Sequence, residues 1–228
     1  MLSNKKTHQG FSLVELMIAM AVGLFLMGGV VSIFGASAKA QSESMQTARL
    51  QQELRAALSI MRTDIRRAGY WGNALASLGA NNPFTTATTD INVLSGGSCI
   101  LYSYDINKDG IVDNNTEYFG FRLNNNAIEM RTSGTVTDDC SINAEWATVT
   151  DSSIVTVTNL NFDTSNYDCS NITNSADIDC TVPVTGDVLQ TIRQLDITLT
   201  GTLSNSPTIA RSYNDTIRVR NDRLTTTP

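Results

Sequence analysis

The stretch Gly10–Phe34, GFSLVELMIAMAVGLFLMGGVVSIF, decides how this chain is built. Its only ionisable side chain is that of Glu15, and no charged residue occurs from Leu16 to Ala38. A run of about 18 or more apolar residues is long enough to cross the roughly 30 Å hydrocarbon core of a bilayer as a helix. The stretch therefore predicts a membrane-spanning helix close to the N-terminus.

Glu15 is out of place in such a run. A carboxylate in lipid costs about 2 to 3 kcal/mol at the bilayer centre and less near the edge, so Glu15 needs a partner. If the chain were cut after Gly10, the new α-amine of Phe11 would lie four residues before Glu15. That spacing places the two groups on the same face of a helix, one turn apart.

The residues Gly10–Glu15 (GFSLVE) resemble the type III signal sequence of type IV prepilins and type II secretion pseudopilins. The resemblance implies that a prepilin peptidase in the membrane cuts after Gly10 and methylates Phe11. It also implies that Glu15 helps to dock the subunit into a growing filament. An ordinary signal anchor with a stray acid is the rival interpretation, but it does not explain the glycine, the acid and the short basic leader together.

The residues before the apolar run predict its orientation. Lys5 and Lys6 lie in the leader, which contains no acid. Positive residues keep their end of a spanning segment in the cytoplasm, so we expect everything after Ala38 to face the periplasm. A secretory signal peptide cleaved near 36–38 is an alternative, but the apolar run is long for such a signal and Glu15 does not suit it.

The chain of 228 residues is long enough for one spanning helix and one medium-sized domain. We predict a cleaved leader at 1–10, a transmembrane and filament-core helix at 11–38, an amphipathic helix at 39–69 and a periplasmic β-rich head at 70–228. The segment 39–67 contains no Pro or Gly, and its apolar residues recur every three or four positions. This apolar stripe comprises Leu50, Leu54, Leu58 (or Ala57), Met61, Ile65 and Ala68. Gly69 is the expected stop.

The remainder of the chain has the alternating pattern of β-strands. Expected strands are Cys99–Tyr104, Glu117–Leu123, Ala127–Thr132, Ile154–Phe162 with a bulge near Asn159, Leu195–Thr200 and Ile209–Val219. The segments 81–97, 135–151 and 163–182 are expected to be loops, with Trp146 covering the core. The predicted fold class is therefore α+β, a pilin-like ladle with a long N-terminal helix packed on an antiparallel β-sheet head.

Four cysteines, Cys99, Cys140, Cys169 and Cys180, lie in the predicted periplasmic part. In that compartment an even number of cysteines indicates disulfides, and three pairings are possible. Cys99–Cys140 with Cys169–Cys180 is favoured, because the second pair brackets a polar, turn-rich loop. A zinc site is not expected, since no CxxC pair occurs and the only histidine, His8, lies in the leader.

The charge is unevenly distributed. The whole chain has a formal charge of −6, but 69–228 has 18 acids and 8 bases. An acidic outer domain argues against nucleic-acid binding. Five arginines lie towards the end of the predicted helix: Arg49, Arg55, Arg62, Arg66 and Arg67. We interpret them as a solvated helix face, with a local basic strip as the alternative.

The segment 105–113 fits the first nine positions of an EF-hand-type calcium loop, with Gly110 at the sharp turn. Its candidate ligands are Asp105, Asn107, Asp109, the carbonyl of Ile111, Asp113 and Glu117. The pattern departs from an EF-hand at position 12, which is Thr116, and Glu117 comes one residue late. No flanking helices are expected, so a polar hairpin loop is the alternative. Calcium is the one cofactor that the sequence suggests.

Catalysis has little support, because the mature chain would contain no histidine. We do not expect an enzyme.

The segment Arg66–Gly72 (RRAGYWG) resembles the end of the helix in PilW-type minor pilins. Many of those proteins have a cysteine after the final glycine, where this chain has Asn73, so their disulfide pattern is not carried over. Val188–Leu195 and Arg218–Asp222 also resemble the C-terminal half of that group.

The resemblance implies a minor pilin of a type IV pilus that primes assembly or forms part of the tip. The alternatives are a type II secretion minor pseudopilin and an adhesin or DNA-binding pilin. Implied partners are other minor and major pilins, the prepilin peptidase, the inner-membrane assembly platform and a tip adhesin. The implied location is the bacterial inner membrane, with the head in the periplasm, and then the pilus.

Overall fold

The computed structural model describes residues 10–74, 81–135, 139–140 and 145–227. The chain divides into two compact units, Met1–Gln46 and Thr47–Pro228. One α-helix, α1 (Leu13–Ile65), passes through both. Its 53 residues correspond to a length of roughly 80 Å at 1.5 Å per residue.

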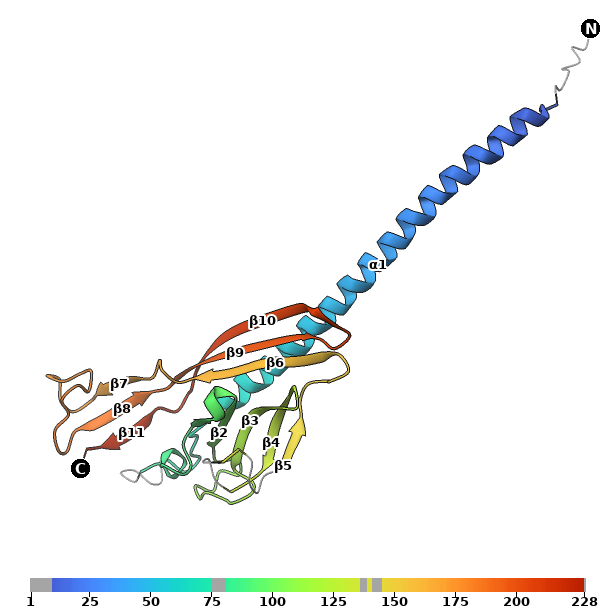
Figure 1. Ribbon diagram of the computed structural model, residues 1–228. Helices are drawn as coiled ribbons and strands as arrows, with labels where there is room; N and C mark the ends of the chain where they lie inside the picture. Colours follow the sequence, from blue (N-terminus) through green and yellow to red (C-terminus); the bar gives the residue numbers. More distant parts are fainter. Residues whose placement is uncertain (1–9, 75–80, 136–138, 141–144, 228) are drawn as a thin grey trace, which may run out of the picture. The chain divides into compact units, whose positions relative to one another are not determined.

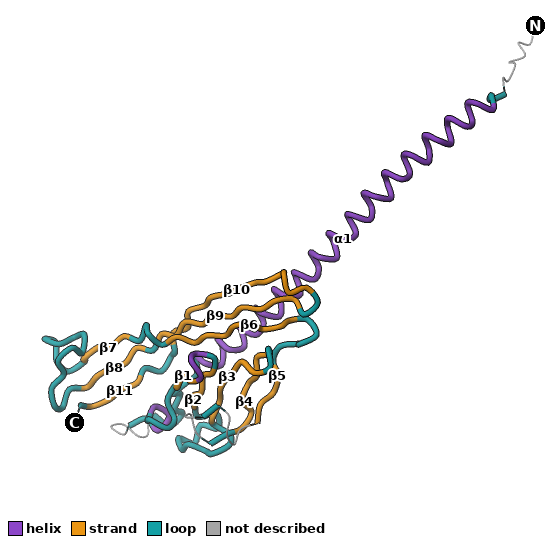
Figure 2. Tube along the Cα trace, in the orientation of Figure 1, coloured by secondary structure: helices purple, strands orange, loops and turns teal. Residues whose placement is uncertain are grey.

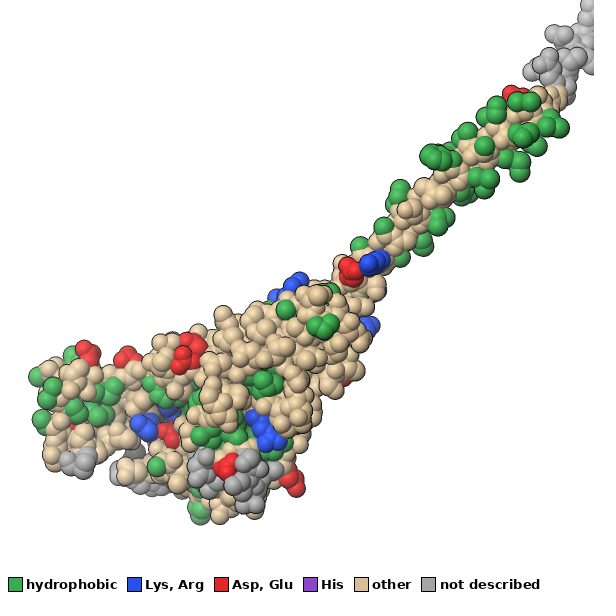
Figure 3. Space-filling model, in the orientation of Figure 1, with side chains coloured by type: hydrophobic (Ala, Val, Ile, Leu, Met, Phe, Trp, Pro, Cys, Tyr) green, Lys and Arg blue, Asp and Glu red, His purple; other side chains and the backbone are tan. Residues whose placement is uncertain are grey.

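The first unit is the N-terminal part of α1. Ser12 starts the helical hydrogen bonding, since its carbonyl accepts from the backbone N–H of Leu16 at 3.1 Å. The most apolar window of 18 residues has a mean hydropathy of 2.4, and none of it is buried. The helix is long and apolar enough to cross a membrane. Hydrophobic side chains cover the visible face of this segment in Figure 3.

The second unit begins with the remaining turns of α1, which carry an apolar stripe. The buried residues of this stripe are Leu50, Leu54, Ala57, Leu58, Met61 and Ile65. Burial of each large aliphatic side chain stabilises the fold by about 1.5 to 3 kcal/mol. The stripe packs against β-sheets of the same unit, so this unit has the α+β pilin-like architecture that the sequence predicts.

Three antiparallel sheets make up the rest of the head (Figures 1 and 2). The five-stranded sheet has the order β1 (Asn92–Leu94), β2 (Cys99–Ser103), β3 (Tyr118–Asn124), β4 (Ala127–Ser133) and β5 (Glu145–Thr148). The second sheet has the order β10 (Ser206–Arg218), β9 (Gln194–Leu203) and β6 (Val155–Asp163). The third has the order β11 (Arg223–Thr226), β8 (Val188–Ile192) and β7 (Asp168–Asn171).

One hydrophobic core joins α1 to the first two sheets. Strand β9 shows how it is built: Leu195, Ile197 and Leu199 are buried, and the residues between them are partly exposed. This is the alternation expected of a strand with one wet face. Among the described residues, none from the β7–β8–β11 sheet belongs to this core. That sheet is therefore a separate small layer.

The predicted strands are all present, and the register of β6 shifts between Val157 and Asn159, where the bulge was expected. Three expected loops were wrong in part, because each contains short structure: β1 and two 3₁₀ turns in 81–97, β5 in 135–151 and β7 in 163–182. Strands of three or four residues contain too few alternations to be recognised as a pattern.

The end of the helix was also predicted too late. Helix α1 ends at Ile65, and hydrogen-bonded turns continue to Ala68. Gly69 follows with φ +72°, the left-handed conformation expected of the residue that stops a helix.

Candidate functional site

The residues of the predicted processing site lie at the start of the first unit. Gly10 and Phe11 precede the helix, and the side chain of Phe11 is 87% exposed. A Cβ added at Gly10 would meet no atom within 4 Å, so no described residue packs against this glycine. Glu15 lies in the first helical turn, where the positive end of the helix dipole favours a carboxylate.

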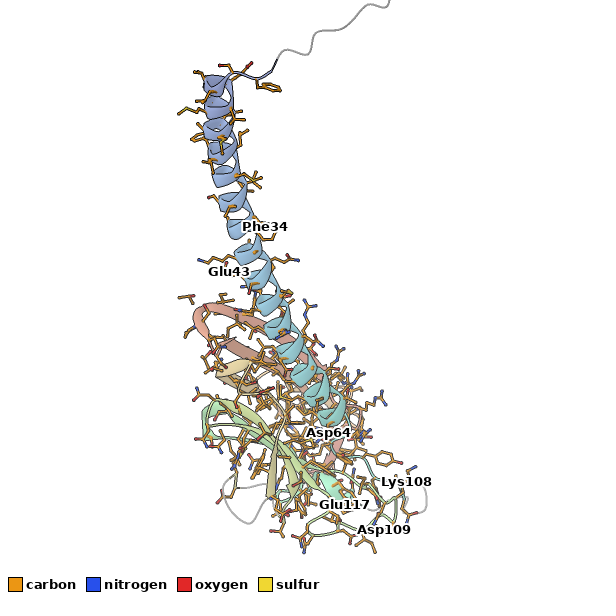
Figure 4. The ribbon with its side chains drawn as sticks, turned by 90° about the vertical axis from the view of Figure 1, so that its right-hand side faces the viewer. Phe34, Glu43, Asp64, Lys108, Asp109 and Glu117 are labelled. Carbon is orange, nitrogen blue, oxygen red and sulfur yellow. A yellow bond between two sulfur atoms is a disulfide. The ribbon has the colours of Figure 1, made fainter. Side chains whose placement is uncertain are left out.

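The surface after Glu15 is apolar on every side. The large side chains from Leu16 to Phe34 are 52 to 84% exposed. Monomeric soluble proteins rarely expose contiguous apolar patches larger than a few hundred Å². This segment therefore needs a cover of lipid or of other apolar helices. In Figure 4, Phe34 lies on this segment and Glu43 lies beyond it along α1.

A carboxylate anchors the other end of α1 to the five-stranded sheet. Asp64 accepts hydrogen bonds from the hydroxyls of Tyr102 at 2.6 Å and Tyr104 at 2.9 Å, and its oxygen lies 3.8 Å from the guanidinium of Arg67. Burial, reinforced by the charge of Asp64, raises the pKa of both tyrosines well above the ordinary value. Both phenols therefore remain protonated donors at any physiological pH, and this network fixes the end of the helix.

A buried arginine ties together three segments that are far apart in the sequence. Arg193 is 1% exposed; it pairs with Asp90 and donates to the carbonyls of Asn221 and Ala68. Arg223 also donates to Asp90, at 3.2 Å. A buried charge is tolerated only when it is paired. These contacts therefore indicate that Arg193 has a structural role and holds the end of the helix against the two C-terminal sheets.

Gly69 leaves room for that arginine. A Cβ at Gly69 would lie 2.6 Å from Nη2 of Arg193, and the positive φ of Gly69 independently disfavours any other residue. Nearby, burial raises the pKa of Tyr167 to about 12. The phenol of Tyr167 is therefore protonated at neutral pH.

The expected calcium loop is the connection between β2 and β3. Asp105 is 1% exposed, and its carboxylate accepts backbone N–H bonds from Lys108 at 2.5 Å, Gly72 at 2.9 Å and Gly110 at 3.0 Å. At the other end, the carboxylate of Glu117 accepts from the backbone N–H groups of Ile106 and Asp113, both at 2.9 Å. The two carboxylates thus hold the loop in shape by binding its backbone.

The middle of this loop is exposed and closed by side-chain contacts. The amide nitrogen of Asn107 donates to Asp109 at 2.9 Å and to Asp113 at 3.0 Å, whereas Ile111 is 66% exposed. Lys108, Asp109 and Glu117 lie together in Figure 4.

Burial raises the pKa of Glu117. Across the described residues, no group of three or more His, Cys, Asp or Glu is placed to hold a metal ion. Calcium binding stays a prediction.

All four cysteines form disulfides, Cys99–Cys140 and Cys169–Cys180, the pairing that the sequence analysis favours. The second bond closes the turn that follows β7. Trp146 lies in the edge strand β5 rather than over the core, with the guanidinium of Arg122 4.2 Å from the centre of its ring.

The sequence analysis did not identify Asp64 or Arg193 as anchoring residues. The sequence contains a signal for each of them. Asp64 is an acid among arginines, and Arg193 is a charged residue within the run of alternating apolar residues that spans β8 and β9. Lys5, Lys6, His8 and the rest of the leader before Gly10 lie outside the described residues.

Comparison with known proteins gives two family matches. A model described as prepilin peptidase-dependent protein B matches residues 43–219, and a model of the prokaryotic N-terminal methylation motif matches residues 5–31. The chain is also 26% identical over 126 residues to the Prepilin peptidase-dependent protein B of Escherichia coli (strain K12). That alignment covers 54% of this chain and 62% of the relative, which is less than two thirds of its length. No solved structure matches the chain significantly.

Proposed function

Because this chain belongs to the prepilin peptidase-dependent protein B family, we propose that it is a minor pilin of a type IV pilus. As a structural subunit without enzymatic activity, it would help to initiate pilus assembly or form part of the tip complex. The observation that carries this proposal is the exposed Gly10–Phe11 junction, followed by Glu15 and a helical surface that is apolar all round.

The proposed mechanism begins with removal of residues 1–10 and methylation of Phe11. Cleavage creates a positive amine that can offset the carboxylate of Glu15, either within the chain or in a neighbouring helix. In a low-dielectric surrounding an unpaired carboxylate is costly, so pairing favours the register in which an amine meets Glu15. The apolar surface of residues 16–34 would pass from lipid contacts to contacts with other pilin helices.

The proposed location is the inner membrane with the head in the periplasm, followed by the pilus. The two disulfides agree with an oxidising compartment. The partners we propose are the prepilin peptidase, the assembly platform of the inner membrane, other minor and major pilins, and a tip adhesin.

Replacing Glu15 by alanine tests the proposal, with Glu43→Ala as the matched control. Glu43 is a second acid on the exposed part of α1, and its contact with Lys39 at 4.0 Å is solvent-exposed and worth little. We expect the Glu15→Ala protein to be folded and cleaved after Gly10, but to enter filaments at least about ten-fold less than its parent. Glu43→Ala should assemble normally.

The measurements are mass spectrometry of the mature N-terminus and quantification of the protein in sheared pili. Assembly of Glu15→Ala at the level of the parent would contradict the proposal, as would a native protein that retains residues 1–10. Incorporation into a secretion pseudopilus instead of a pilus would favour the second interpretation from the sequence, a type II secretion pseudopilin.

A further inference from the structure

A basic hollow lies where α1 ends. Its lining consists of Arg62, Thr63, Arg66, Arg67 and Arg220, and its volume is about 240 Å³. Four of these five residues are arginines, in a head whose remainder is strongly acidic. We call this feature the arginine hollow.

The fold brings the four arginines together from two distant segments. Three of them belong to the last turns of α1 and the turn that follows. Arg220 comes from the segment after β10, and its backbone N–H donates to the carbonyl of Arg66 at 3.2 Å. This hydrogen bond fixes the fourth arginine beside the other three, so the cluster results from tertiary structure and not only from sequence spacing.

The positive charge in the hollow exceeds the negative charge next to it. Arg62 lies 3.5 Å from Asp215, and Arg67 lies 3.8 Å from Asp64. Within the described part of the chain, the ion pairs include neither Arg66 nor Arg220. The C-terminal end of a helix contributes only about half a negative charge, so roughly one and a half positive charges remain without a counter-charge.

An unsatisfied donor lies among these charges. The Nε atom of Arg66 is buried and has no hydrogen-bond partner. A buried donor without an acceptor costs about 1 to 3 kcal/mol. The hydroxyl of Thr63 donates to the carbonyl of Ser59 at 2.8 Å and makes no hydrogen bond to Nε of Arg66. The hollow therefore presents the guanidinium groups of four arginines to a ligand.

We propose that the arginine hollow binds an oxyanion of the phosphate class. A phosphate group carries about −1.5 to −2 charges at pH 7 and has three strong acceptor oxygens, which matches the excess charge. A carboxylate would leave part of that charge uncompensated. Guanidinium groups bind such oxygens in paired, planar geometry. A long polyanion is disfavoured, because the surrounding head carries a net charge of −10 over residues 69–228.

The test uses the full chain in a neutral detergent. Inorganic phosphate is titrated while the arginine Nε–H signals are followed by NMR, and the arms are Arg66→Gln, Arg220→Gln and Arg211→Gln. Arg211 is the control: it is exposed in β10, outside the arginine hollow, and donates to a neighbouring carbonyl. We expect phosphate to bind the parent and Arg211→Gln alike, and each of the other two variants to bind at least about ten-fold more weakly.

Nanodiscs distinguish the two sources of a phosphate group. If the hollow binds a lipid head group, phosphatidylglycerol discs will shift the same arginine signals relative to phosphatidylcholine discs, and inorganic phosphate will compete. If it binds free phosphate, the two discs will give the same signals.

Arg220→Gln keeps the proposal testable should Arg66→Gln fail to fold, since Arg220 is exposed. Three results would overturn the proposal. The first is that the parent binds neither inorganic phosphate in detergent nor phosphatidylglycerol in nanodiscs. The second is that Arg211→Gln loses as much phosphate affinity as the variants in the hollow, and the third is that the parent binds an acidic peptide but not phosphate.

Discussion

The two parts of helix α1 have the same backbone and opposite surfaces. From Leu13 to Gln46 the apolar side chains are exposed, whereas from Thr47 to Ile65 all the large ones except Ile60 form one buried stripe, with polar residues on the other side. The cause is visible in the spacing. In the first part apolar residues follow one another almost without a break from Leu16 to Phe34, and in the second they recur every three or four positions.

This difference separates folding from assembly within a single helix. A stripe can be covered by the sheets of the same chain, so the second part contributes to the free energy of unfolding of the head. A helix that is apolar all round needs partners on every side, which one small head does not offer. Substitutions in the two parts should therefore have different consequences.

The largest effect is expected from Leu54→Ala in the buried stripe. Leu54 is 0% exposed, and its Cδ2 lies 3.0 Å from the position of a Cβ at Gly201 in β9, so its removal leaves a cavity between helix and sheet. Loss of a buried leucine side chain costs about 2 to 5 kcal/mol. Denaturant unfolding of the full chain in detergent, followed by tryptophan fluorescence, measures this loss.

Leu26→Ala is the matched control for the comparison, because Leu26 is 62% exposed in the first part of α1. The head of this variant should unfold at the same denaturant concentration as the parent. If both variants destabilise the head equally, the division of α1 into an assembly part and a folding part is wrong.

A smaller loss, of about 2 to 3 kcal/mol, is expected from Asp105→Ala. This substitution removes the acceptor for three backbone N–H groups. Gly72 and Lys108 are exposed, so water can replace the acceptor there, and only part of the cost of about 1 to 3 kcal/mol per unsatisfied buried donor applies. One of these donors is Gly72, just beyond the end of α1, so the variant also tests whether the loop helps to anchor that end.

Asp109→Ala serves as the comparison within the same loop. Asp109 is exposed and accepts bonds from its neighbours in the loop, so we expect a change of less than about 1 kcal/mol. Thermal unfolding in the presence of a chelator measures both variants without any contribution from calcium. Equal losses would contradict the anchoring role of Asp105.

Much of this architecture was predictable, because it depends on patterns that are local in sequence. The apolar run, the stripe from Leu50 to Ile65 and the alternation of β9 each indicate an element and its buried face. The pairing of Arg193 with Asp90 was not predictable, since more than a hundred residues separate them in sequence and no period relates them. The arginine hollow depends likewise on Arg220, which only the folded chain brings beside Arg66.

The β7–β8–β11 sheet was also not predictable from the sequence. Its strands have four or five residues each, and the described sheet adds nothing to the main core. Neither a hydrophobic period nor a buried face therefore marked it in the sequence. Its disulfide, Cys169–Cys180, was favoured only because of the polar loop between the two cysteines.

The smallest effect is expected from calcium at the loop of Asp105. The amide nitrogen of Asn107 lies between the carboxylates of Asp109 and Asp113, a position where a cation would be favourable if the amide turned over. A ligand of the folded state stabilises by RT ln(1 + [L]/Kd), so weak binding at millimolar calcium should raise the unfolding temperature of the parent only slightly. Asp113→Ala should abolish the rise, and magnesium should not reproduce it, because it tolerates irregular oxygen cages poorly. An unfolding temperature of the parent that does not move would leave this loop as a turn closed by its own hydrogen bonds.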